Sequence, residues 1–339
     1  MQVSYIGLDI AKSVFHVIGQ SRSGREVLKK KLRRGQVLEF FAQLPACRVG
    51  IEACGSAHHW ARELERLGHT VRMLPAQAVK AYVPGAKNDF NDAAGICEAL
   101  QSRRIHAVAV KSIEQQDRHM MCRLRAATVK QRTAQANRLH GMLAEYGVVT
   151  AKGIAALRRR LPELLEEADN GLSAALRELL GEEYQELVRL DERVRVHDRR
   201  LARIAREAEA PRRLAEVPGL GPVLSCTLSA HIGDGHQFSN GRAFAASIGL
   251  VPHQHSTGGR ARLLGISKRG DPGLRALLVN GARAVLARAE QRQDRLSRWA
   301  LALVRRRPFN VVVVALANKL ARIAWVLLAR NQHFDPARA

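Results

Sequence analysis

The chain has 339 residues, of which 46% are hydrophobic, and this composition excludes a disordered protein and is enough for two domains or one large one. The 55 Lys and Arg residues outnumber the 31 Asp and Glu residues and give a formal charge of +24, which indicates a polyanionic partner. Only 4% of the residues are aromatic and no lipidation motif is present, so a nucleic acid fits this charge better than a membrane surface.

Five widely spaced cysteines without a C-x-x-C pair indicate reduced thiols in a cytosol. The N-terminus enters a strand-like pattern at once, without the features of a signal peptide. The apolar run at residues 311–317 ends at Asn318 and Lys319, which is too short to span a bilayer. The sequence therefore predicts a cytoplasmic protein with no membrane partner.

The first hundred residues alternate between strand and helix patterns. Strands are expected at residues 5–10, 13–19, 47–53 and 69–75, helices at 35–45 and 58–68, and an exposed basic strand and turn at 25–35. The order strand, helix, strand over residues 47–75 is typical of a crossover unit with parallel pairing.

Four carboxylates stand at special places in this pattern. Asp9 lies in an apolar strand, where a carboxylate is costly to bury unless it is paired or binds a metal ion. Glu52 is near the C-terminal end of a strand, where ligands gather in open α/β sheets. Asp89 and Asp92 are three residues apart at the start of a helical pattern, so both point to one face.

Each of these residues also has a purely structural interpretation. Asp9 would then be a hydrogen-bonded strand-end residue, and Asn88 or Asp89 an ordinary helix N-cap followed by acidic residues that favour the helix dipole. Four carboxylates that converge in a basic protein nevertheless suggest two bound Mg²⁺ ions, which could clamp both oxygens of a phosphoryl transfer. The motifs GLDIAK, IEACG and KNDFNDA, in this order, resemble an RNase H-like fold of the resolvase (RuvC) type.

Two long helical patterns follow at residues 112–146 and 172–208. The first has an approximate apolar stripe of Met120, Leu124, Ala127, Ala134, Leu139 and Leu143. The second has Leu or Val at positions 176, 179, 180, 187, 190, 194 and 201. The two helices could form an antiparallel coiled pair or a dimerisation arm, and a simple intramolecular hairpin is the alternative.

Glycine and proline return after Pro211. The segment VPGLGPVLSCTLSA resembles a helix-hairpin-helix element, in which the backbone around Gly219 and Gly221 would face a phosphate, although such a sequence also occurs in plain turns. A glycine-rich turn, Ser256 to Gly259, could bind phosphate as a plain nest or carry a serine nucleophile. We expect nucleic-acid contacts from Gly219, Gly221, Gly258, Gly259, Arg260, Arg262, Lys268, Arg269 and Arg275. A final apolar helix is expected at residues 309–330.

Together with GLVPHQHSTGGRARLLGISKRGD, these motifs resemble, in order and over nearly the whole chain, the insertion-sequence family 110 transposases, and most closely subgroup 1111. The resemblance implies a DEDD domain, a coiled-coil region and a C-terminal transposase domain with a nucleophilic serine. It also implies a bridge RNA that pairs with donor and target DNA, and a homo-oligomer in which the acidic site of one subunit faces the serine of another.

Carried over by position, the resemblance assigns Asp9, Glu52, Asp89 and Asp92 as the metal-binding catalytic tetrad and the HSTGG turn as the site of the nucleophile. Many relatives have the serine directly before glycine, where this chain has Thr257. We assign Ser256, because a primary hydroxyl attacks phosphorus with less steric hindrance.

The sequence thus predicts an α/β RNase H-like domain over residues 1–108, a helical coiled-coil region over 109–210 and a mostly helical transposase domain over 211–339. The predicted protein is a Mg²⁺-dependent recombinase that forms a covalent phosphoserine intermediate. It is guided by bridge RNA and works as a dimer to tetramer. The alternatives are a metal-dependent Holliday-junction nuclease without a covalent intermediate and a non-catalytic nucleic-acid-binding protein.

Overall fold

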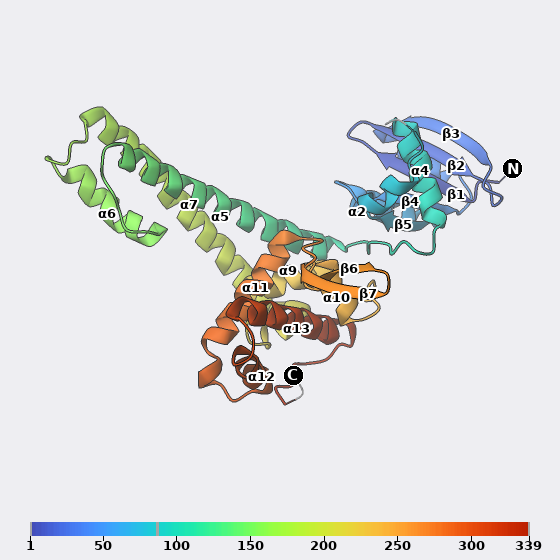
Figure 1. Ribbon diagram of the computed structural model, residues 1–339. Helices are drawn as coiled ribbons and strands as arrows, with labels where there is room; N and C mark the ends of the chain where they lie inside the picture. The colour runs from blue at the N-terminus through green and yellow to red at the C-terminus, as the bar shows by residue number, and fades with distance from the viewer. Residues whose placement is uncertain (1, 86–87, 338–339) are drawn as a thin grey trace. The chain divides into compact units, whose positions relative to one another are not determined.

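The computed structural model describes residues 2–85 and 88–337, and the chain forms two compact units, Met1–Ser112 and Ile113–Ala339 (Figure 1). The helical region that we predicted at residues 109–210 belongs almost entirely to the second unit, together with residues 211–339. The division into three domains stays a prediction.

The N-terminal unit contains a five-stranded sheet in the order β3-β2-β1-β4-β5. Its strands are β1 (Tyr5–Ile10), β2 (Val14–Gln20), β3 (Glu26–Arg33), β4 (Arg48–Glu52) and β5 (Thr70–Leu74). Strands β1, β2 and β3 are antiparallel, whereas β1, β4 and β5 are parallel, which confirms the predicted strands and the crossover unit.

Helices cover both faces of this sheet. They are η1 (Arg34–Gln36), α1 (Val37–Ala42), α2 (Ala57–Arg66), α3 (Ala76–Val79), η2 (Lys80–Tyr82) and α4 (Asp89–Gln101). Helices α1 and α2 pack on one face, in a core that contains Leu8, Phe15 and Trp60. Helix α4 packs on the other face, where Ile96 and Leu100 are buried. The odd-numbered residues of β1 therefore face α4 and the even-numbered ones face α1 and α2.

Close approach of backbone to backbone fixes α4 on the sheet. A Cβ atom on Gly7 would lie 2.0 Å from the Ala93 carbonyl oxygen, so only glycine fits there. Farther along the helix, a Cβ atom on Gly50 would lie 3.1 Å from the Ile96 side chain. Because Ala93 sits over Gly7, the first turn of α4 lies near the C-terminal end of β1.

An arm of three helices begins the second unit: α5 (Ile113–Glu145), α6 (Ile154–Glu166) and α7 (Ala174–Glu207). Arg125 pairs with Asp198 at 2.6 Å and Arg132 with Asp191 at 2.8 Å, which shows that α5 and α7 run antiparallel. The antiparallel pairing thus lies within one chain, as the alternative of an intramolecular hairpin expected, and a dimerisation arm stays a prediction.

The arm also corrects two details of the sequence analysis. Met120, Leu124, Ala127 and Ala134 are all exposed, so the predicted stripe of α5 is wrong at these four positions. It is correct only at the buried Leu139 and Leu143. Instead α5 buries Cys122, Thr128 and Gln135. The Thr128 hydroxyl donates to the Leu124 carbonyl oxygen of its own helix, and the Gln135 amide donates to the Glu183 carbonyl oxygen of α7. Helix α6, which we did not predict, packs its leucines into the core of the arm.

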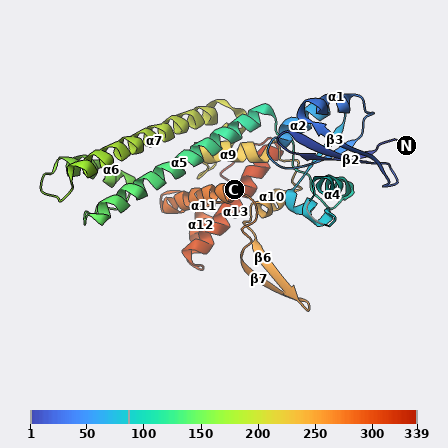
Figure 2. The same cartoon turned by 90° about the horizontal axis from the view of Figure 1, so that it is seen from above.

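A helical body and one hairpin complete the second unit. The elements are α8 (Glu209–Ala215), α9 (Pro222–Ile232), α10 (Gly241–Ser247), β6 (Pro252–Thr257), β7 (Arg260–Ile266), α11 (Pro272–Ala287), η3 (Ala289–Gln291), α12 (Arg295–Val304) and α13 (Phe309–Ala329). The strands β6 and β7 form a two-stranded hairpin that extends away from the helices (Figure 2).

Helix α13 is the predicted C-terminal helix and the centre of the core. It is long and apolar enough to cross a membrane by length and composition alone, and among the described residues it is the one such helix. Half of its most apolar 18-residue stretch is buried inside the protein, and the side chains of Leu316 and Leu320 are fully buried. We therefore interpret α13 as a core helix.

Candidate active site

The four predicted carboxylates lie on one face of the N-terminal sheet. In β1, Asp9 follows Gly7 by two residues and so points to the same face, the one that α4 covers. In β4, Glu52 follows Gly50 by two residues and shares that face. Since Leu8 is paired with Ile51 in the parallel ladder, Asp9 and Glu52 occupy adjacent strands at the same level.

The first turn of α4 supplies the other two carboxylates. The Asn88 side chain accepts a hydrogen bond from the Phe90 backbone N–H at 2.9 Å and caps the helix. Asp89 and Asp92 follow in the first turn, where negative charge is favoured by the helix dipole. The structural interpretation of this motif is therefore correct for Asn88, and it is compatible with a functional role for the two aspartates.

Burial and neighbouring charges raise the pKa of two of these carboxyl groups, Asp9 and Glu52. Burial raises the pKa of Asp9 to about 6, with further contributions from the charges of Asp92, Asp89 and Glu52, while His16 opposes the rise. Burial and the charge of Asp92 also raise the pKa of Glu52. The neighbouring carboxylates are thus close enough to Asp9 and Glu52 to disfavour the ionised forms of these two groups.

His16 is a site residue that the sequence analysis missed. It is paired directly opposite Asp9 in the antiparallel ladder of β1 and β2, so it lies on the same face. Its ring is buried, packs edge-on against Phe90, and has Nδ1 3.7 Å from Oδ2 of Asp89. The alternation of residues 13–19 indicates only which residues share a face with His16, because its place beside Asp9 depends on the hairpin register.

A metal ion is chemically compatible with this edge of the sheet. Among the residues that the structure describes, no group of three or more His, Cys, Asp and Glu side chains is arranged to hold a metal ion. The donor set nevertheless fits a hard cation, because carboxylate oxygens are the ligands of Mg²⁺ and a cation would relieve the repulsion at Asp9.

The predicted nucleophile lies on the β6–β7 hairpin of the other unit, and its surroundings differ from our expectation. Gly258 and Gly259 form the turn, with φ angles of 54° and 78°, as a two-residue hairpin of this kind requires. Ser256 therefore lies within strand β6, not on the turn itself. It is exposed, and its Oγ accepts a hydrogen bond from Nε2 of Gln254 at 2.7 Å.

The register of the hairpin separates Ser256 from two of the predicted arginines. Ser256 is paired with Ala261, whereas Thr257 is paired with Arg260 and His255 with Arg262. Because paired residues share a face and neighbours alternate, Ser256 is on one face of the ribbon. Arg260 and Arg262 are on the other face, together with Thr257.

The remaining basic candidates follow the hairpin. Lys268 has a φ of 54°, and a Cβ atom on Gly249 would lie 2.3 Å from the backbone nitrogen of Arg269, so this loop is tightly packed. Nη1 of Arg275 donates to the carbonyl oxygens of Ile248 at 3.0 Å and Arg269 at 2.7 Å. These two bonds give Arg275 a structural role in holding the loop.

The predicted helix-hairpin-helix segment joins α8 to α9. Gly219 has a φ of 88°, and a Cβ atom there would lie 2.7 Å from the carbonyl oxygen of Gly281 in α11. Packing against α11 therefore requires glycine at position 219. Gly221 is exposed and is the N-cap of α9, with open space around it. Of the two glycines, Gly221 is therefore the one with room for a ligand.

Comparisons with known proteins bear on both sets of residues. A family model described as "Transposase", of the IS110 DEDD type, matches residues 6–148, and a second, described as "Transposase IS116/IS110/IS902 family", matches residues 211–298. The chain belongs to the IS116/IS110/IS902 family of transposases. The first match spans the four carboxylates, and the second spans the β6–β7 hairpin.

Relatives cover the chain from end to end. A probable family 20 transposase of Pseudomonas aeruginosa is 48% identical over 99% of this chain and 100% of its own length. The transposase for insertion sequence element IS1328 of Yersinia enterocolitica is 40% identical over 98% of this chain and 99% of its own. The transposase for IS1111A of Coxiella burnetii is 39% identical over 98% and 91%. The predicted family resemblance is confirmed.

Proposed function

We propose that this protein is a DNA recombinase of an insertion sequence that cuts and rejoins strands through a covalent phosphoserine intermediate. The observation that carries the proposal is the convergence of Asp9, Glu52, Asp89 and Asp92 on one sheet face, where burial, and then the neighbouring negative charges, raise the pKa of Asp9 to about 6. Perturbed carboxylates of this kind are typical of functional sites. An Asp on the first strand that meets later acidic residues also supports an RNase H-like fold of the RuvC type.

In the proposed reaction, Oγ of Ser256 attacks the phosphorus of a phosphodiester, and the proton that it loses is balanced by the proton that the leaving nucleotide oxygen takes up. The bond from Oγ to phosphorus forms as the bond from phosphorus to the leaving nucleotide oxygen breaks. Attack by another DNA hydroxyl later reverses these changes and releases the serine. One phosphate ester replaces another at each step, so rejoining needs no ATP.

The protein groups have separate parts in this chemistry. The four carboxylates would hold Mg²⁺, which when bound offsets negative charge on the phosphate. Exposed Arg260 and Arg262 would bind the DNA backbone on the hairpin face that carries Thr257. Because Ser256 is on the face of the hairpin opposite to these arginines, they would bind phosphates adjacent to the one that is cleaved.

Donor DNA, target DNA and a bridge RNA are the proposed nucleic-acid partners, and a homo-oligomer is the proposed active form. The formal charge of +24 supports polyanionic partners. Ser256 and the carboxylates belong to different compact units, and a composite site between subunits would unite them on one DNA strand.

Incubation of the purified protein with Mg²⁺, element-encoded RNA and end-labelled DNA tests this proposal. On a denaturing gel, the wild type should give a labelled protein–DNA adduct and recombinant product, and Ser256→Ala should give neither. The matched variant Thr257→Val should keep the adduct, because it removes the neighbouring hydroxyl and preserves the β-branched shape. Adduct from Ser256→Ala and none from Thr257→Val would transfer the role to Thr257.

A metal-only nuclease is the second candidate. It is favoured by the hydrogen bond at Ser256. Among the described residues, the side-chain hydrogen bond at Oγ of Ser256 comes from the amide of Gln254, which is a donor and not a general base. In that case water attacks the phosphate at the acidic edge. Cleavage of DNA without any adduct, and insensitive to Ser256→Ala, would support the nuclease.

A further inference from the structure

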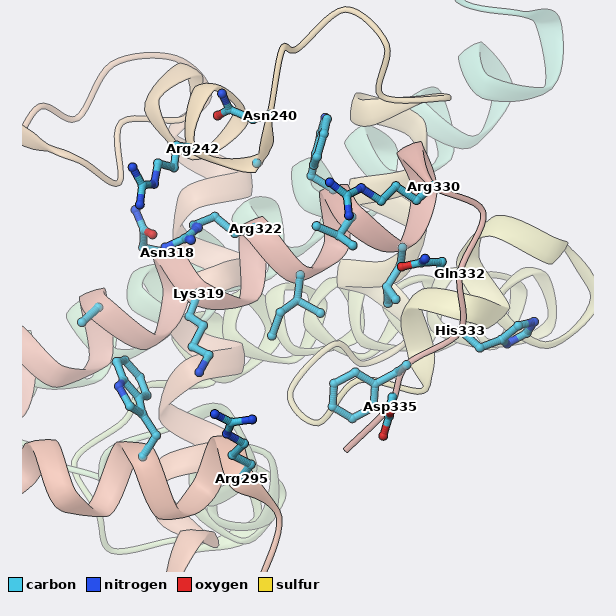
Figure 3. A pocket seen from close by; sticks show the side chains of 18 residues that line it. Asn240, Arg242, Arg295, Asn318, Lys319, Arg322, Arg330, Gln332, His333 and Asp335 are labelled. Carbon is cyan, nitrogen blue, oxygen red and sulfur yellow. The ribbon is translucent and has the colours of Figure 1, made fainter. Parts of the chain in front are cut away.

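A large cavity lies in the helical body of the C-terminal unit, and neither Ser256 nor the carboxylates line it. Its volume is about 1020 Å³, and its walls are α10, α12, α13 and residues 332–335 (Figure 3). Pockets for small molecules typically occupy roughly 300–1,000 Å³. The cavity is therefore large enough for a ligand bigger than a single phosphate group.

One wall is the open face of α13, the most apolar helix of the chain. Lys319, Arg322 and Arg330 recur on that face at helical spacing, whereas the opposite face is buried in the core. At a rise of 1.5 Å per residue, the row from Lys319 to Arg330 is about 16 Å long. A helix otherwise built for burial thus presents a line of cations to the cavity.

The neighbouring helices add to this charge. A Cβ atom on Gly241 would lie 3.1 Å from Cα of Arg322, so α10 packs directly on α13 and brings Arg242 to the cavity. Figure 3 shows Arg242 and Arg322 gathered around Asn318, and the ends of Lys319 and Arg295 pointing toward each other from α13 and α12.

Among the residues that line the cavity, Asp335 is the one carboxylate against these five cations. Within residues 2–85 and 88–337, no carboxylate lies within 4.0 Å of the charged groups of Arg242, Arg295, Lys319, Arg322 and Arg330. Nζ of Lys319 instead lies 4.7 Å from the ring centroid of Trp299. Burial, and then the charges of Arg295 and Arg322, lower the pKa of Lys319. An anion in the cavity would relieve this repulsion.

We propose that this cavity binds the phosphodiester backbone of a nucleic-acid strand. Arginine forks match phosphate oxygens in pairs, and a row of cations about 16 Å long fits several consecutive phosphates of a polymer rather than one free phosphate. This inference rests on the proposed function in one respect, because that function makes nucleic acid the expected anionic ligand. It adds a second contact surface, separate from the hairpin and the acidic edge.

The test compares two double variants that lose the same charge. Lys319→Gln with Arg322→Gln removes two cations from the cavity wall. Arg305→Gln with Arg306→Gln removes two exposed cations from the turn after α12, outside the cavity. Fluorescence anisotropy of the full-length chain with labelled single-stranded RNA, single-stranded DNA and duplex DNA of one sequence, from 50 to 300 mM NaCl, gives affinity and salt dependence for each.

We expect the cavity variant to bind roughly tenfold more weakly at 150 mM NaCl and to lose about 1.4 from the slope of log affinity against log salt for a single strand. The control should stay within about twofold of the wild type. Unchanged binding by the cavity variant, or equal losses by both variants, would overturn the proposal. Loss confined to RNA or to DNA would identify the source of the strand.

Two further measurements keep the result independent of folding and of the serine chemistry. The single variant Arg322→Lys keeps the positive charge at an exposed position. If folding is intact, it should therefore bind with most of the wild-type affinity. Ser256→Ala should bind all three probes like the wild type. Adduct formation by the wild type together with unchanged binding by the cavity variant would show that the cavity proposal alone has failed. Weaker binding by the cavity variant together with no adduct from the wild type would show that the proposed serine chemistry alone has failed.

Discussion

The acidic edge and the β6–β7 hairpin carry the two halves of the proposed chemistry, and they are built in opposite ways. The acidic edge takes side chains from β1, β4 and α4, and contacts as close as Gly7 against Ala93 fix these elements. The hairpin consists of two strands whose residues are exposed at every position except Ile266. The fold therefore positions the carboxylates, whereas Ser256 is exposed on the hairpin, where we propose that a bound nucleic acid positions it.

Loss of one carboxylate should have the largest effect. Asp9→Asn should lower the rate of DNA strand cleavage on the order of 10³-fold, because several kcal/mol of charge stabilisation are lost with the metal ion. The control Glu39→Gln removes an exposed charge from α1, on the opposite side of the sheet. Gel-based cleavage rates in Mg²⁺ measure both. Equal rates for Asp9→Asn and the wild type would exclude a catalytic role for this edge.

The second-largest effect is expected from a change in the backbone packing of β1 against α4, beneath the acidic edge. Gly7→Ala should reduce the free energy of unfolding of the N-terminal unit by about 3 kcal/mol, because its Cβ would meet the Ala93 carbonyl oxygen at 2.0 Å. Gly35→Ala is the matched control, since nothing lies within 4 Å of a Cβ at Gly35. Urea unfolding of the full-length chain measures both. A neutral Gly7→Ala would mean that α4 does not rest on β1.

The sequence predicted the sheet and the acidic edge better than the serine site. Period-two alternation through Gly7 and Asp9, and the helix start after Asn88, follow from local preferences that packing did not override. His16 was missed because its position beside Asp9 depends on the hairpin register. Ser256 was expected on the turn, but the two left-handed glycines form the whole turn and leave Ser256 in a strand. The basic cavity joins three helices and residues 332–335, so no local pattern reveals it.

The pH dependence of stability should show a smaller effect. The pKa of Asp9 is about 6 in the folded protein and near 3.8 in the unfolded chain, so the folded state binds this proton more tightly. Without metal, the free energy of unfolding of the wild type should therefore fall as the pH rises from about 4 to about 6. Asp9→Asn abolishes this loss, so above pH 6 it should be more stable than the wild type by about 1 kcal/mol, after allowance for partial exposure.

Urea unfolding at pH 4, 5, 6 and 7.5 in EDTA measures this difference. Addition of Mg²⁺ should then stabilise the wild type and leave Asp9→Asn unchanged, since binding to the folded state alone raises stability. A constant difference between the two proteins at every pH would contradict the assigned cause of the shift.

Substitutions on the hairpin should have the smallest effect on stability. Ser256→Ala and Thr257→Val should each change the free energy of unfolding by less than about 0.5 kcal/mol, because both residues are exposed. Urea unfolding in the same buffer measures both. A loss of more than 1 kcal/mol from either would show that the hairpin is part of a packed structure in the isolated chain.

The formation of a protein–DNA adduct tests the central claim most directly. Wild type, Ser256→Ala and Asp9→Asn are incubated with RNA, Mg²⁺ and end-labelled DNA, and the products are separated on a denaturing gel. The account predicts a labelled adduct with the wild type alone, because the serine and the acidic edge are both needed. An adduct from Ser256→Ala in wild-type yield would contradict Ser256 as the nucleophile, and cleavage without any adduct would establish the metal-only nuclease instead.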